Sequence, residues 1–208
     1  MKKTGFNLLV FVFVLMMMGT FLNPSMSVAA TDSDLITPVQ MGVLATIAIN
    51  CDASVTMNAI TGTGQSTIDA NNRALCNVQT NNSAGYKLEW QASSATMISG
   101  DDTIAAYTPA VADTPETWSI GATTSEWGAH VGSGSTTVNT TTWGAADTYA
   151  GGKWLNVGTS AFQIASRSDE TTWAGDDEYV YFGAQVGSTK LQPTGTYAVN
   201  VTVTATTL

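Results

Sequence analysis

The sequence predicts an all-β fold, and three observations support that prediction. Residues that favour strands dominate, Thr and Val above all, while the helix formers Glu, Lys, Arg and Leu are scarce. Apolar and polar residues alternate in several short segments, which is the period of a half-buried strand. Turn-forming residues, chiefly Gly, Asn and Ser, separate these segments. This combination is typical of a sandwich or a barrel.

Residues 1–30 are predicted to be a cleaved signal peptide. Two lysines open the segment, an apolar run covers residues 6–22, and Val28-Ala29-Ala30 supplies the small residues of a cleavage site. An uncleaved membrane anchor and a prepilin-type processing site stay open as alternatives. Cleavage predicts a mature chain that begins at Thr31, has no integral membrane span, and is secreted or held at the cell surface.

Residues 31–208 are predicted to form a single β-sandwich domain. Its first strand is expected within residues 31–49, where apolar residues stand at every second position: Val39, Met41, Val43, Ala45, Ile47 and Ile49. One face of that strand is therefore apolar.

Shorter strands are predicted along the rest of the chain, each bounded by turn residues. They are expected from Val55 to a turn at Thr61–Gly64, over Leu75–Thr80, over Tyr86–Gln91, around Trp118, Trp127, Trp154 and Phe162, over Tyr179–Val186, and over Tyr197–Thr204. The turn Pro193-Thr194-Gly195 precedes the last of them. Such a succession predicts an antiparallel β-sandwich of the immunoglobulin-like or jelly-roll type.

The charge of the mature chain excludes one class of partner. All 16 acidic residues follow Ala30, and two of the seven basic residues precede it, so cleavage takes the net charge from −9 to −11. The few remaining cations cannot form a surface that neutralises phosphates. Nucleic acid is therefore not expected as a partner, and the acidity is expected to keep the protein soluble.

Cys51 and Cys76 are the only cysteines, and they are predicted to form a disulfide. Paired cysteines in an exported chain usually form a bridge, and this one would stabilise the fold by about 3 kcal/mol on the chain-entropy estimate. A metal or redox pair is the alternative. A soft-metal site needs further Cys or His nearby, however, and the spacing is not that of a C-x-x-C motif.

These features resemble bacterial surface β-sandwich proteins, a group that includes fimbrial (pilin-type) subunits and spore-coat-U-like domains. The resemblance rests on the signal peptide, on Cys51 and Cys76, and on the run Pro193-Thr194-Gly195-Thr196-Tyr197-Ala198-Val199-Asn200-Val201. It covers the two ends of the mature chain. It implies a structural role with self-association or with other surface subunits as partners.

The resemblance also gives the N-terminal segment a second interpretation. In fimbrial families, an N-terminal extension with alternating apolar residues completes the sheet of a neighbouring subunit through main-chain hydrogen bonds and side chains that fill pockets. Val39, Met41, Val43 and Ala45 have this periodicity. The segment is therefore expected to be either the first strand of its own sandwich, which we favour, or an exchanged strand.

The sequence does not predict an enzyme. His130 is the only histidine, and it is expected at the surface or in a turn. The chain has no Gly-x-Ser-x-Gly elbow and no phosphate-binding loop.

Acidic pairs leave two weaker alternatives, a carboxylate glycosidase and a calcium site. The clusters are Asp101-Asp102, Asp169-Glu170 and Asp176-Asp177-Glu178, and all three are expected to be solvated loop acids. No cofactor is therefore predicted, with Ca²⁺ as the alternative.

The tryptophans suggest a different function. Trp90 and Trp154 stand in alternating segments and are expected in the core, whereas Trp143 and Trp173 have loop-like neighbours. An exposed Trp can stack on a sugar ring, so Trp143 and Trp173 are candidate glycan contacts. The predicted function is a non-enzymatic, secreted bacterial cell-surface or fibre-forming structural protein. The alternative is a carbohydrate-binding or adhesive module.

Overall fold

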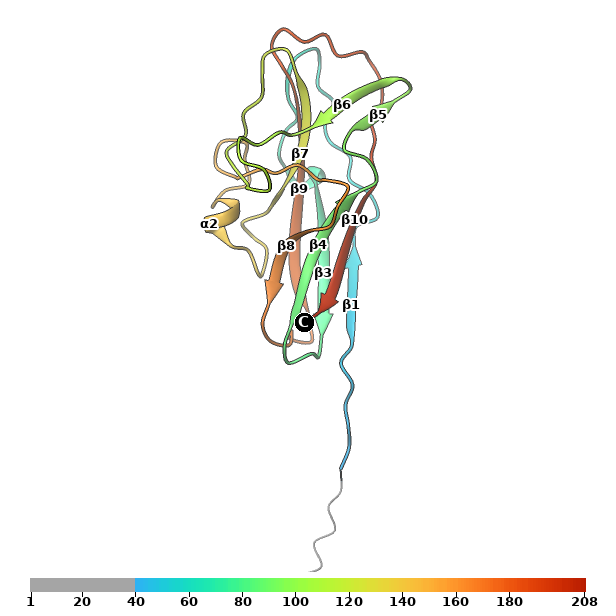
Figure 1. Ribbon diagram of the computed structural model, residues 1–208, viewed down its shortest axis with the longest axis vertical. Coiled ribbons are helices and arrows are strands. Elements are labelled where there is room, and N and C mark those ends of the chain that lie inside the picture. The colour runs from blue at the N-terminus through green and yellow to red at the C-terminus, as the bar shows by residue number, and fades with distance from the viewer. Residues whose placement is uncertain (1–39) are drawn as a thin grey trace, which may run out of the picture. The chain divides into compact units, whose positions relative to one another are not determined.

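The computed structural model describes residues 40–208, so the predicted signal peptide and Val39 lie outside the described residues. The described chain is almost entirely β-structure (Figure 1). Its strands are β1 (Ile47–Cys51), β2 (Gly64–Gln65), β3 (Arg73–Thr80), β4 (Tyr86–Ala92), β5 (Met97–Ser99), β6 (Asp102–Ala106), β7 (Ser125–Val131), β8 (Phe162–Arg167), β9 (Asp176–Val186) and β10 (Val201–Thr207). A 3-10 turn, η1 (Ala70–Asn72), and a short helix, α2 (Thr140–Trp143), complete it.

The strands form two sheets that pack face to face. The larger sheet has the order β1-β3-β9-β7-β6-β5, with β2 added beside β9, and the smaller has the order β10-β4-β8. Neighbouring strands are antiparallel except β6 and β7, which are parallel. The prediction of an all-β sandwich is confirmed.

Strict alternation along the central strands builds the core between the sheets. In β3 and β4 every second residue is buried, as expected when one face of each strand meets the opposite sheet. Val78, Val180 and Phe182 from the larger sheet pack with Leu88 and Trp90 from the smaller one. The strands predicted over Leu75–Thr80, Tyr86–Gln91 and Tyr179–Val186 are therefore confirmed as β3, β4 and β9.

A second, aromatic cluster is formed by Tyr107, Trp118, Trp154 and Tyr181. It depends on Gly128 and Gly183, which are direct partners across β7 and β9. A Cβ on Gly128 would meet Tyr107 and Trp118, and a Cβ on Gly183 would meet Trp154. Because the two glycines have no side chains, the aromatic rings pack directly on the backbone of β7 and β9 at this point.

The first strand is much shorter than predicted. β1 begins at Ile47, and residues 40–46 belong to no strand. The reason is the length of its partner, because Ile47 pairs with Thr80, the last residue of β3. Beyond Thr80 the partner chain turns toward β4, so the residues before Ile47 have no ladder to join.

Three other predicted strands also differ from the structure. The segment that contains Val55 and Met57 is irregular, although both side chains pack against the core. Trp154 lies outside the named strands and joins Glu116 by a single bridge next to Trp118. The last strand begins at Val201, after one bridge between Ile98 and Ala198. Within residues 40–208 no helix has the length and apolar character needed to cross a membrane.

Candidate functional site

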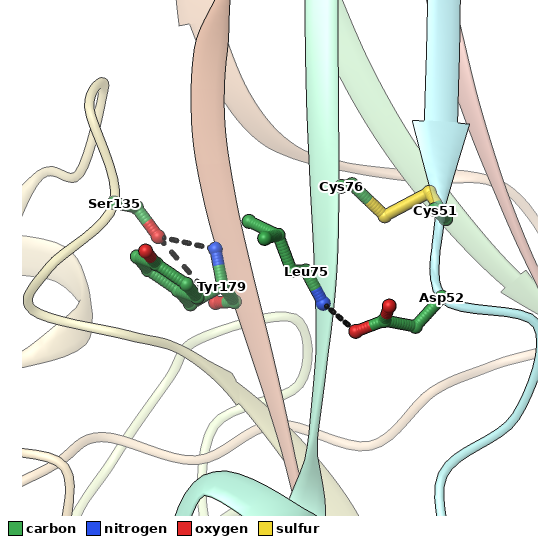
Figure 2. The surroundings of a disulfide bond; sticks show 6 residues. All are labelled: Cys51, Asp52, Leu75, Cys76, Ser135 and Tyr179. Carbon is green, nitrogen blue, oxygen red and sulfur yellow. Dashed lines mark hydrogen bonds between the residues drawn. A yellow bond between two sulfur atoms is a disulfide. The ribbon is translucent and has the colours of Figure 1, made fainter.

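The predicted disulfide between Cys51 and Cys76 is present and closes the end of β1 (Figure 2). The two cysteines are direct partners in the β1–β3 ladder, 25 residues apart in sequence. Asp52 is the next residue after Cys51. Its backbone N–H donates to the carbonyl of Leu75 at 3.0 Å, and its carboxylate accepts from the Leu75 N–H at 2.9 Å. The end of this edge strand is thus fixed covalently and by two hydrogen bonds.

The flank of the sandwich beside the disulfide is the candidate site. β1 and β10 are the terminal strands of the two sheets, and they lie side by side on this flank (Figure 1). Their inward side chains are only half-buried, unlike those of the central strands: Ile47, Ile49, Val201, Val203 and Ala205. The core is therefore incompletely covered where the two terminal strands meet.

A groove opens into the core at this flank. It has a volume of about 330 Å³ and reaches Trp127 and Phe182 in the interior of the sandwich. Val199, Val201 and Val203 line it where β10 begins, and the Cys51–Cys76 disulfide lines it where β1 ends. The segment that follows β1 lines it as well, through Asp52, Ala53, Ser54, Val55 and Met57. Its walls are mainly apolar, so the groove suits aliphatic side chains.

Both strands at the groove have an edge available for another strand. Among the described residues β1 pairs only with β3, and β10 pairs only with β4. Each therefore presents one row of backbone N–H and C=O groups outside the ladders. A strand added to the free edge of β10 would gain backbone hydrogen bonds along its length and direct every second side chain toward the groove.

The residues that precede β1 expose large apolar side chains. Met41 is 86% exposed, Val43 is 73% exposed, and Leu44 is 84% exposed. Thr46, by contrast, is fixed: its N–H donates to Asn81 Oδ1 at 2.6 Å, and its carbonyl accepts from Thr80 Oγ1 at 2.7 Å. Three of the predicted exchange-face residues, Met41, Val43 and Ala45, are thus solvent-exposed, and the fourth, Val39, lies outside the described residues.

Trp143 is not a surface residue, so its assignment as a glycan contact is wrong. The side chain is 2% exposed, its Nε1–H donates to the carbonyl of Ile164 at 3.1 Å, and its ring lies edge-on to Trp90 at 5.4 Å. The physical reason is α2, which Asn139 caps by accepting from the N–H groups of Thr141 and Thr142. This single helical turn directs Trp143 into the core.

Trp173 is the exposed tryptophan of the described chain. Its side chain is 96% exposed, in the turn between β8 and β9. Gly175 closes this turn with a φ of +77°, which favours glycine, and Gln79 Nε2 donates to the Trp173 carbonyl at 3.0 Å. A hollow of about 530 Å³ lies beside it and is also lined by Thr46 and Ala48. The predicted core positions of Trp90 and Trp154 are confirmed, as both are fully buried.

The acidic clusters divide into two exposed pairs and a buried group. Asp101-Asp102 and Asp169-Glu170 are exposed, as predicted. Asp176 and Glu178 are not loop acids: they lie in β9 at 2% and 0% exposure. In residues 40–208 no three His, Cys, Asp or Glu side chains are grouped so that they could hold a metal ion.

A polar network explains how these two carboxylates are buried. The Tyr86 hydroxyl donates to Asp176 Oδ2 at 3.0 Å and to Glu178 Oε1 at 3.2 Å. Arg167 Nη1 pairs with Asp176 Oδ1 at 3.0 Å, and Thr137 Oγ1 donates to Glu178 Oε1 at 2.8 Å. Among residues 40–208, Glu178 Oε2 has no hydrogen-bond partner. The charge of Asp176 is thus balanced by Arg167, whereas no cation of the described chain pairs with Glu178.

Replacing Glu178 by glutamine is expected to stabilise the protein increasingly as the pH rises. Burial raises the pKa of the Glu178 carboxyl above its usual value, although hydrogen bonds from Thr137 and Tyr86 oppose the shift. Between about pH 4.5 and that raised pKa the folded state holds more protons than the unfolded chain, so the wild type loses stability as the pH rises through this window. The Glu178→Gln variant lacks this titration and still offers an acceptor to Thr137.

Urea unfolding of both proteins, from about pH 4.5 to about pH 8, tests this expectation. The difference in free energy of unfolding should grow through the window and then level off. A difference that stays constant over the whole range would contradict the assignment of Glu178 as a buried, uncompensated carboxyl.

His130 is fully buried, so its predicted surface position is also wrong. Its ring lies between Trp154 and Tyr181, with centroids 5.3 and 5.9 Å away, and its Nε2 lies 3.1 Å from Asp147 Oδ1. Burial lowers the pKa of His130, although the bond to Asp147 opposes the shift. His130 therefore connects the segment that carries Asp147 to β7, which is a structural role.

No family model, curated protein or solved structure matches this chain. The site is therefore defined by its own geometry: an apolar groove where β1 ends and β10 begins, a disulfide in its wall, and a segment of alternating apolar residues just before β1. Sequence reasoning found the disulfide and the segment. It missed the groove, which arises because β1 and β10 end their sheets on the same flank.

Proposed function

We propose that this protein is an exported, non-enzymatic structural subunit of a bacterial cell surface, and that it assembles into fibres by strand exchange. In this assembly, residues Val39–Ala45 of one copy lie in the β1–β10 groove of the next. The observation that carries the proposal is the half-covered apolar flank at β1 and β10, each of which pairs with only one strand among residues 40–208. The disulfide supports an oxidising location outside the cytoplasm.

The segment has the length and the alternating pattern needed to pair with β10. Residues 39–45 number seven, as does β10, and in extended form such a segment spans about 23 Å. One face carries Val39, Met41, Val43 and Ala45, and the other carries Gln40, Gly42 and Leu44. The first face would enter the groove, while the backbone would pair with the free edge of β10.

Chain connectivity favours exchange between copies over folding within one copy. Only Thr46 separates Ala45 from Ile47, the first residue of β1. A chain needs at least a two-residue loop to reverse into an antiparallel neighbour and a much longer connection to reach a parallel one. Thr46 is also fixed by its bonds to Asn81 and Thr80. The segment therefore cannot turn back onto its own β1, and a second copy supplies the groove.

Only one of the two residues that suggested the carbohydrate-binding alternative is exposed. Of its two candidate residues Trp143 is buried, which leaves Trp173 as a single exposed ring. Glycan recognition by stacking remains a property to test at Trp173. Glycan binding at Trp173 does not account for the groove or for the alternating N-terminal segment.

Negative-stain electron microscopy of two forms of the protein tests the proposal. The chain Thr31–Leu208 is expected to form filaments, and the chain Thr46–Leu208 is expected to remain monomeric. The shorter form keeps all of β1 and the bonds of Thr46 to Asn81, so it should fold, which circular dichroism would verify. Adding a peptide of residues 31–45 should give a one-to-one complex with the shorter form. Folded monomers from the longer form, or filaments from the shorter one, would reject the proposal.

A further inference from the structure

The tryptophans of this protein are distributed very unevenly between the interior and the surface. Five of the six are 7% exposed or less, namely Trp90, Trp118, Trp127, Trp143 and Trp154. Trp173 alone is 96% exposed. A large aromatic side chain in this position is costly to leave in water, and such residues frequently anchor protein interfaces.

Trp173 lies at the end of the sandwich where the N-terminal segment joins it. The ladders establish this placement, because Ile47 pairs with Thr80 at the end of β3, and Tyr86 at the start of β4 pairs with Arg167 at the end of β8. Thr46 and Trp173 line the same hollow. Leu44, 84% exposed, accepts a hydrogen bond at its carbonyl from Asn81, which lines that hollow too.

The connection between the N-terminal segment and β1 is short, and its length determines what the Trp173 end of the subunit contacts in the assembly. If residues 39–45 lie in the groove of another copy, a single residue, Thr46, spans the gap between that copy and β1. One residue covers about 3.4 Å in extended form. The end of the donor subunit that carries Thr46 must therefore touch the recipient subunit directly, and Trp173 is part of that end.

We propose that Trp173 and the hollow beside it form a docking surface that is buried against the recipient subunit when two copies assemble. This inference rests on the proposed strand exchange and adds a second, separate contact to it. The occupant of the hollow beside Trp173 is thus a second copy of this chain. The surface is predicted to be solvent-exposed only in the monomer and at one end of a filament.

The other end of the sandwich offers an apolar counterpart. Leu191 is 92% exposed, in the segment between the end of β9 and the start of β10. A donor strand antiparallel to β10 would run toward the start of β10 and leave the groove there. The Trp173 end of the donor would then meet the Leu191 end of the recipient. Two different patches at opposite ends of one subunit produce an open, head-to-tail filament.

Tryptophan fluorescence provides a direct test, because acrylamide quenches exposed rings and Trp173 is the exposed one. The chain Thr31–Leu208 would be titrated with acrylamide as monomer and after assembly. Assembly should remove the readily quenched component and shift the emission to shorter wavelength. The Trp173→Ser variant should assemble roughly tenfold more slowly, and Trp173→Phe should restore the rate.

A binding control separates this inference from the proposed function. The chain Thr46–Leu208 with Trp173→Ser should bind the peptide of residues 31–45 as well as its unsubstituted form does, because Trp173 is not in the groove. Filaments in which Trp173 stays fully quenchable would overturn the docking surface and leave strand exchange intact. Failure of the unsubstituted chain to assemble would overturn both. Protection of Trp173 in the monomer by soluble glycans, without assembly, would overturn the docking surface in favour of carbohydrate binding.

Discussion

Replacing Cys51 and Cys76 together by alanine is expected to lower the free energy of unfolding by about 3 kcal/mol. The bridge joins residues 25 apart, so in the oxidised protein the unfolded chain carries a closed loop of that size. Without it the unfolded state gains conformational freedom. Cys76 is completely buried, and alanine is the replacement that adds no polar group there.

Urea unfolding of the two proteins under non-reducing conditions would measure this loss. The variant should show a lower midpoint and a steeper dependence on urea, because its unfolded state exposes more surface. Reduced and alkylated wild-type protein provides the comparison. Equal free energies of unfolding for the variant and the oxidised wild type would show that the bridge contributes nothing to stability.

The disulfide also matters for the groove. Cys51 is the last residue of β1, and within the part of the chain that the structure describes β1 pairs on one side only, with β3. The bridge to β3, together with the Asp52–Leu75 hydrogen bonds, keeps the end of β1 from separating from the sheet. Since the bridge also lines the groove, its loss should weaken binding of the peptide of residues 31–45 in addition to lowering stability.

The parts of the fold that the sequence predicted best are those governed by local alternation. β3 and β4 are flanked by strands on both sides, so their inward residues are buried and their period of two is clear. The pairing of Cys51 with Cys76 was predictable because no other cysteine exists. The length of β1 was not, because it depends on where β3 ends rather than on the pattern of residues 39–49.

The wrong predictions concern residues whose environment is created by distant segments. Trp143 has Thr and Gly as neighbours, yet α2 places it against Trp90. Asp176 and Glu178 resemble loop acids in sequence, but Tyr86 from the opposite sheet provides a hydrogen bond to both. Gly128 and Gly183 were a usable signal, because glycines inside strands often mark close packing of another group.

The central claim is that one face of the segment before β1 enters the groove of another copy, and a pair of matched charge substitutions separates the two faces. Val43→Asp places a carboxylate on the face predicted to enter the groove, and Gln40→Asp places the same charge on the opposite face. Burying an unpaired carboxylate among apolar side chains costs several kcal/mol, whereas an exposed one costs little. Val43 is 73% exposed, so its substitution should leave the monomer fold unchanged.

The measurement is the yield of filaments from the chain Thr31–Leu208, by electron microscopy and by sedimentation, for the unsubstituted protein and for both variants. We expect the unsubstituted protein and Gln40→Asp to form filaments with similar yields, and Val43→Asp to remain a folded monomer. Filaments from Val43→Asp at the unsubstituted yield, or equal loss of filaments in both variants, would contradict strand exchange through the β1–β10 groove.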